Sequence, residues 1–127
     1  MHLPVFSRLA PAALAVCALA IPQALAKDDA IDFAGVYAVQ GQNPDGTSGY
    51  DGQANIIRTG ETWRVEWYVG DQTFVGTGIG YGDVLAVGYD GGTAVYQRDT
   101  DGTLYGAWAV NGGDTLGAEV LTPILGE

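Results

Sequence analysis

Two glutamates carry the acid–base chemistry that this sequence places away from obvious turns. Glu66 and Glu119 are the acidic residues furthest from clusters of Gly, Asn and Pro. Two carboxyl groups about 5–9 Å apart in a cleft can hydrolyse a glycosidic bond, one as the acid and the other as the base or nucleophile. A carboxylate-dependent hydrolase acting on a glycan or lipid-like substrate is therefore one hypothesis.

Chemistry based on histidine, cysteine or metal has few residues to use. The only histidine is His2 and the only cysteine is Cys17, both close to the N-terminus. The chain from residue 27 onward therefore cannot build a Ser-His-Asp or Cys-His nucleophile, nor a zinc site of His and Cys. The sequence Asp-Thr-Asp-Gly at 99–102 is similar to a fragment of a calcium loop, but it lacks the distal glutamate, and a tight turn accounts for it. We expect no cofactor and no metal site.

Aromatic side chains are the other candidates for a site. An eight-stranded β-barrel is just wide enough to hold one small apolar ligand among them. The alternative is that the same rings fill the barrel as its core, and strands of about seven residues favour this alternative. The predicted ligand-binding residues are Tyr37, Trp63, Trp67, Phe74, Trp108 and Glu119, with Phe33 and Tyr50 as further aromatic candidates.

Clusters of Gly, Asp, Asn and Pro punctuate the chain at short intervals. They lie at 43–46, 60–61, 70–71, 80–83, 90–92, 99–102 and 111–114. These residue types suit tight hairpin turns, and the segments between them are rich in Val, Ile, Thr and aromatic residues, which predicts strands. We expect eight antiparallel strands, at about 33–40, 50–58, 62–69, 72–79, 83–89, 92–98, 102–110 and 115–122.

Alternation along these segments predicts which side chains face a core, because successive side chains of a strand point to opposite sides. Trp63, Val65 and Trp67 share one face, which we expect to be the core face. Glu66 lies on the other face and is expected in solvent. Three tyrosines are also expected to face outward, where exposed aromatics would suit a protein partner: Tyr68, Tyr81 and Tyr105.

The last predicted strand, at 115–122, has apolar residues on both faces. The pattern therefore leaves the direction of Glu119 open. An exposed edge carboxylate is the plainer expectation. The alternative is a buried acid with a raised pKa, which would mark a site.

Glycine recurs on the predicted core face. The pattern of a large residue, any residue and then glycine occurs at 33–35, 50–52, 74–76 and 104–106. Glycine at such positions lets a sheet coil sharply and leaves room for a ring from the next strand. We therefore expect an all-β fold, an antiparallel up-and-down meander that closes into a small barrel without exposed edges. An open meander is the alternative.

Residues 1–26 have the layout of a secretory signal peptide. Arg8 precedes an apolar run at 9–21, and a small-x-small sequence ends at Ala26. We expect cleavage after Ala26, and a periplasmic or secreted protein with a single β-barrel domain at 27–127. The apolar run is too short to span a bilayer, which needs about 20 residues.

The chain from residue 27 onward is strongly acidic. It holds all 15 acidic residues and four of the five basic ones, so its net charge is −11. This field repels nucleic acid and anionic headgroups, and it attracts cations or a basic partner. The predicted strands, of seven to nine residues with polar second faces, also differ from those of a membrane barrel. We expect neither nucleic-acid binding nor a membrane-spanning protein.

Several strand and turn motifs cover most of the chain after residue 27. They are Gly-Val-Tyr-Ala-Val at 35–39, Asn-Pro-Asp-Gly at 43–46, Tyr-x-Gly at 50–52, Trp-Arg-Val-Glu-Trp at 63–67, Gly-Thr-Gly at 76–78, Leu-Ala-Val at 85–87, Asp-Gly-Thr-Leu-Tyr-Gly-Ala-Trp at 101–108 and Gly-Ala-Glu-x-Leu-Thr-Pro at 117–123. In these motifs the chain resembles small exported proteobacterial all-β proteins, mostly hypothetical and sometimes labelled fibronectin-binding. It is also similar to lipocalin and avidin-like barrels, whose first strand opens with Gly-x-aromatic. The resemblance implies an exported barrel.

The leading interpretation is an exported, non-enzymatic binding or interaction module. The strand pattern and the missing catalytic residue types favour it over the hydrolase. Its partner is expected to be a host or periplasmic protein held by the outer tyrosines, or a small apolar ligand held at a mouth of the barrel.

Overall fold

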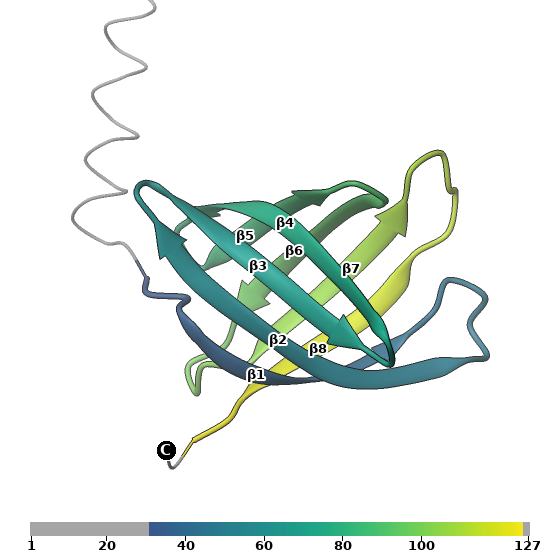
Figure 1. Ribbon diagram of the computed structural model, residues 1–127, viewed down its shortest axis with the longest axis horizontal. Coiled ribbons are helices and arrows are strands. Elements are labelled where there is room, and N and C mark those ends of the chain that lie inside the picture. Colours follow the sequence, from purple (N-terminus) through teal and green to yellow (C-terminus); the bar gives the residue numbers. More distant parts are fainter. Residues whose placement is uncertain (1–30, 126–127) are drawn as a thin grey trace, which may run out of the picture. The chain divides into compact units, whose positions relative to one another are not determined.

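The computed structural model describes residues 31–125, which form a closed barrel of eight antiparallel strands (Figure 1). Each strand pairs with the next along the chain, and the first pairs with the last. The strands are β1 (Gly35–Gln42), β2 (Gly49–Thr59), β3 (Thr62–Val69), β4 (Gln72–Tyr81), β5 (Val84–Tyr89), β6 (Gly92–Arg98), β7 (Leu104–Val110) and β8 (Gly117–Pro123). The predicted all-β fold and its closure are confirmed. The expected signal peptide lies outside the described residues.

Two strands are longer than predicted. β2 has 11 residues and β4 has 10, so the expectation of shorter strands was wrong for both. At the end of β4 the predicted four-residue turn shrinks to Gly82 and Asp83, because Tyr81 pairs with Val84 of β5. The positive φ of Gly82, 61°, allows this two-residue turn. No helix within residues 31–125 has the length and apolarity to cross a membrane.

Side chains alternate between core and solvent as predicted. Trp63, Val65 and Trp67 face the core of the barrel and are at most 5% exposed. On the opposite face of β3, Arg64 Nε donates a hydrogen bond to Glu66 Oε2 at 2.6 Å. The three tyrosines predicted to face outward are all exposed: Tyr68, Tyr81 and Tyr105.

Inward aromatic rings lie opposite glycines of the neighbouring strand. Tyr96 of β6 pairs with Gly106 of β7, and a Cβ on that glycine would lie 2.4 Å from the ring. Trp108 and Gly117 have the same relation across β7 and β8, also at 2.4 Å. Tyr50 and Gly41 repeat it across β1 and β2. Trp63 and Tyr89 also pair with glycines, Gly78 and Gly76, but they come closest to them through Cβ rather than through the ring. Of the glycines predicted on the core face, Gly106 has the expected role, because a ring of the neighbouring strand occupies the place of its missing side chain.

One end of the barrel, here called the closed end, carries the turns β2–β3, β4–β5 and β6–β7. Phe33, which precedes β1 rather than lying in it, is 1% exposed and meets Trp63 edge to face, with ring centroids 5.5 Å apart. The Tyr37 hydroxyl donates to the Phe33 carbonyl oxygen at 2.7 Å. Arg58 Cζ lies 4.9 Å from the centroid of the Trp63 ring. These side chains seal the closed end.

Both described chain ends are also at the closed end. β1 begins there and β8 finishes there, since Tyr37 pairs with Pro123, and the Ile124 amide donates to the Val36 carbonyl at 2.9 Å. The opposite end, here called the open end, carries two tight turns and the two longest loops, at 43–48 and 111–116. Figure 1 shows both loops projecting from the same end of the barrel.

Candidate functional site

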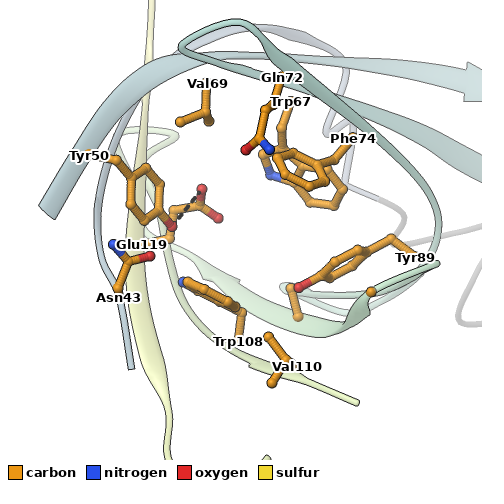
Figure 2. A pocket seen from close by; sticks show the side chains of 12 residues that line it. Asn43, Tyr50, Trp67, Val69, Gln72, Phe74, Tyr89, Trp108, Val110 and Glu119 are labelled. Atoms are coloured by element: carbon orange, nitrogen blue, oxygen red, sulfur yellow. Dashed lines mark hydrogen bonds between the residues drawn. The ribbon is translucent and has the colours of Figure 1, made fainter. Parts of the chain in front are cut away.

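A cavity of about 410 Å³ lies in the open end of the barrel. Its volume falls in the range of small-molecule sites, about 300–1,000 Å³. The lining is mostly aromatic and aliphatic: Asn43, Tyr50, Trp67, Val69, Gln72, Phe74, Tyr89, Gly91, Ala94, Trp108, Val110 and Glu119. We call it the open-end pocket (Figure 2).

Five aromatic side chains from five different strands surround the pocket. Trp67 and Phe74 each meet the ring of Tyr89 edge to face, with centroid distances of 5.4 and 6.4 Å. Tyr50 and Trp108 form a second edge-to-face pair at 6.3 Å. Figure 2 shows the rings arranged around the space rather than filling it. The alternative that all inward rings form a filled core is therefore wrong at the open end, although it holds at the closed end.

Glu119 points into the barrel at the base of this pocket. It is 6% exposed, so the expectation of an exposed edge carboxylate was wrong. On β8 it pairs with Gly41 on one side and Gly106 on the other, neither of which has a side chain. The rings of Tyr50 and Tyr96 occupy the space over these two glycines and thereby bring their hydroxyl groups to the carboxyl.

Both tyrosine hydroxyls donate to this carboxyl. Tyr96 donates to Glu119 Oε1 at 2.5 Å, and Tyr50 donates to Oε2 at 3.3 Å. Trp67 Nε1 in turn donates to the Tyr96 hydroxyl at 3.2 Å. The shorter bond has the length of a charge-assisted O–H···O⁻ contact. An inward carboxyl group is therefore tolerated because two donors from distant strands replace water.

The buried position changes the proton affinities of this group. Burial raises the pKa of Glu119, and the hydrogen bonds from Tyr96 and Tyr50 oppose that rise. Burial and the nearby Glu119 charge raise the pKa of Tyr50, Tyr89 and Tyr96. The tyrosines therefore keep their protons and remain donors, while Glu119 is the group of this cluster that titrates at the lowest pH.

Trp108 supplies a second polar feature. Within residues 31–125, its Nε1 is the one buried side-chain nitrogen or oxygen without a hydrogen-bond partner. Leaving such a donor unpaired costs about 1–3 kcal/mol. This nitrogen acts on the nearby Tyr50 hydroxyl, where it partly offsets the rise in the pKa of that tyrosine. The pocket thus offers a ligand one carboxyl group, that of Glu119.

The structure brings together most of the predicted site. Four of the six predicted residues line the open-end pocket: Trp67, Phe74, Trp108 and Glu119. The other two, Tyr37 and Trp63, are 5% and 4% exposed and belong to the packed closed end. Phe33, a further candidate, packs there as well, whereas the candidate Tyr50 lies in the pocket.

Two tyrosines at or beside the pocket were not predicted as site residues. Tyr89 lies in phase with Leu85 and Val87 of β5, and Tyr96 lies in phase with Ala94 of β6. The alternation that identified the other inward rings would have found both. Tyr89 sits at the end of its strand beside a turn cluster, which obscured its phase.

The two glutamates lie on opposite faces of the sheet. Glu66 is on the outside of β3, where hydrogen bonds from Arg64 and then from Tyr68 lower its pKa. Glu119 is the only carboxyl among the residues that line the pocket. The predicted carboxylate pair of a hydrolase is therefore not formed by these two residues.

The fold and the pocket place this chain in the broad class of small antiparallel β-barrels with one sealed and one open mouth. Comparison with models of known protein families gives no match, and neither does comparison with curated protein sequences.

Proposed function

We propose that this protein is an exported, non-enzymatic binding module that holds a small ligand with an apolar body in the open-end pocket. The observation that carries the proposal is the contrast between rings that pack against one another at the closed end and five rings that surround a cavity at the open end. An apolar lining with a few convergent polar groups is typical of ligand sites. Here those groups are Glu119 and the amides of Asn43 and Gln72.

Export is part of this proposal. The charge, apolar run and small-x-small sequence of residues 1–26 support secretion into the periplasm or beyond. In that compartment the domain would meet ligands diffusing from outside the cell. Because the chain from residue 27 onward has no cysteine, its folding there needs no disulfide exchange.

A hydrolase is the less favoured function. Glycoside hydrolysis normally needs a second carboxyl group across the scissile bond, and Glu119 is alone in the pocket lining. The raised pKa of Glu119 suits an acid, but an acid without a partner lacks the base or nucleophile. Incubation with chromogenic glycosides and esters should therefore release no product above the level given by a Glu119→Gln control.

Binding is tested with N-phenyl-1-naphthylamine, a neutral apolar dye whose fluorescence rises in apolar surroundings. We expect saturable binding of one dye per protein. Phe74→Ala should weaken it about three- to tenfold, because one ring face of the pocket is lost. Tyr68→Ala is the matched control, since Tyr68 is 39% exposed on the outside while Phe74 is 38% exposed at the pocket.

Two results would contradict the proposal. One is an absence of saturable fluorescence. The other is equal weakening by Phe74→Ala and Tyr68→Ala, because dye adsorbed to the outer surface would then explain the signal.

A further inference from the structure

The open-end pocket contains one carboxyl group and no basic group. Apart from Glu119, its lining consists of aromatic, aliphatic, amide and glycine residues. Tyr50 and Tyr96 aim their hydroxyl protons at the carboxyl, so the ionised form is hydrogen-bonded on both oxygens. A positively charged group would be attracted to it, whereas an anionic ligand would be repelled at low dielectric.

The rings around the carboxyl suit a cation as well. Edge-to-face pairing leaves ring faces free in each pair, and a ring face attracts an ammonium group placed within about 6 Å of its centroid. The attraction grows when the cation is removed from water. Tyr50, Trp67, Tyr89 and Trp108 form two such pairs and line one partly enclosed space.

Charge around the mouth has the same sign as charge inside it. Each of the four connections at the open end carries one aspartate and no basic residue: Asp45, Asp71, Asp90 and Asp114. The arginines of the described residues lie elsewhere. Arg58 and Arg98 stand at strand ends of the closed end, and Arg64 lies on the outside of β3. A mouth lined by one sign of charge raises the local concentration of oppositely charged ligands.

A metal ion fits this pocket poorly. Within residues 31–125 no three His, Cys, Asp or Glu side chains are grouped to hold one. Hard cations such as Ca²⁺ take six to eight oxygen ligands, and the pocket lining offers one carboxylate among rings. A cation whose charge is spread over alkyl groups needs fewer ligands and tolerates apolar walls.

We infer that the ligand is an organic cation: a small molecule with an apolar or aromatic body and an ammonium head, which lies beside Glu119 between the rings. This inference rests on the proposed function, because it names the chemical class of the ligand held in the same pocket. The aspartates of the four connections draw the cation to the mouth, and the rings and carboxylate retain it.

The test compares phenyltrimethylammonium with tert-butylbenzene, which has the same shape and no charge. Binding is followed through tryptophan fluorescence, since Trp67 and Trp108 line the pocket. We expect the cation to bind about tenfold or more tightly than the neutral compound at low salt. Glu119→Gln should abolish this preference, because it weakens binding of the cation more than binding of the neutral compound. Glu66→Gln, a carboxyl change on the outer face, should leave the preference intact.

A pH series on the unaltered protein is a second measurement, which does not depend on how the variants fold. The groups that face Glu119 are Tyr50 of β2, Tyr89 of β5 and Tyr96 of β6, and their raised pKa values keep them neutral in acid. Protonation of Glu119 should therefore weaken cation binding as the pH falls, with little change for the neutral compound.

The outcomes separate the two proposals. Equal affinity for both compounds overturns the cationic ligand, and so does a preference for the cation that survives in Glu119→Gln. In either case, saturable binding of the apolar dye would still support the proposed binding function. Binding of the dye without binding of either phenyl compound also overturns it. If the dye does not bind either, the proposed function fails and this inference fails with it.

Discussion

At the closed end of the barrel, the Trp63 ring lies over Gly80 and meets Phe33 edge to face. At the open end, Trp108 lies over Gly117 in the same way, yet it borders a cavity. A ring over a glycine therefore occurs at both ends, and this contact does not determine whether the ring packs in a core or borders a cavity. The difference comes from Phe33, a residue outside the strands that fills the closed end, whereas polar loops flank the open one.

The largest test of this comparison concerns tryptophans at the two ends. Trp63→Ala should lower the free energy of unfolding by about 3–5 kcal/mol, because it empties a packed site. Trp108→Ala should cost only about 1–2 kcal/mol, since its ring is partly exposed and already borders a cavity. Urea unfolding followed by circular dichroism measures both. Similar losses would show that the open end is packed like the closed end.

A second prediction concerns the glycine under a ring. Gly106→Ala should destabilise the protein by about 1–3 kcal/mol, because its Cβ would lie 2.4 Å from the Tyr96 ring and the ring must move. It should also weaken binding of phenyltrimethylammonium, since Tyr96 holds Glu119 in place. Gly88→Ala on β5 is the control, with nothing within 4 Å of the added Cβ. If both variants unfold at the same urea concentration, the ring-over-glycine packing is looser than the distances indicate.

A smaller effect is expected on the pH dependence of stability. The folded protein holds the Glu119 proton more tightly than the unfolded chain does. The stability that this tighter proton binding contributes is complete below the ordinary pKa of 4.5 and is lost as the pH rises through the pKa of the folded state. Glu119→Gln should remove that loss, and its melting temperature should fall less than that of the unaltered protein between pH 4 and 8. Glu66→Gln should not remove it, because the pKa of Glu66 is lowered.

The smallest predicted effect concerns charge at the two ends. Asp71→Asn, Asp90→Asn and Asp114→Asn combined should weaken phenyltrimethylammonium binding about two- to threefold at low salt and not at high salt, where surface charges are screened. A triple change at the closed end is the control: Glu61→Gln, Asp83→Asn and Asp99→Asn. An equal effect of the two triples would mean that net charge, rather than its position, sets the attraction.

The strands and turns were predictable because their signals are local. Gly and Asp clusters locate the turns, and alternation in segments such as 62–69 gives the core face. The direction of Glu119 was not predictable from β8 alone, since both faces of that strand carry apolar residues. Its direction is stabilised by hydroxyls 69 and 23 residues away in the chain, from Tyr50 and Tyr96. No local pattern contains that information.

The division between core and pocket was likewise beyond the sequence pattern. Tyr37, Trp63, Trp67 and Trp108 have the same alternation signal, yet two pack in the closed end and two line the pocket. What separates them is their height along the barrel axis, which depends on the register between strands. Register is a property of paired strands, whereas alternation is a property of one.

Both described chain ends leave the barrel opposite the pocket, and this arrangement has a practical consequence. A peptide tag, a sensor chip or a fused enzyme joined after Leu125 would hold the protein with its mouth directed outward, unobstructed for titration. Fusion through the loops at 43–48 or 111–116 would instead crowd the entrance. An immobilised reagent made from this scaffold is therefore best anchored through its termini.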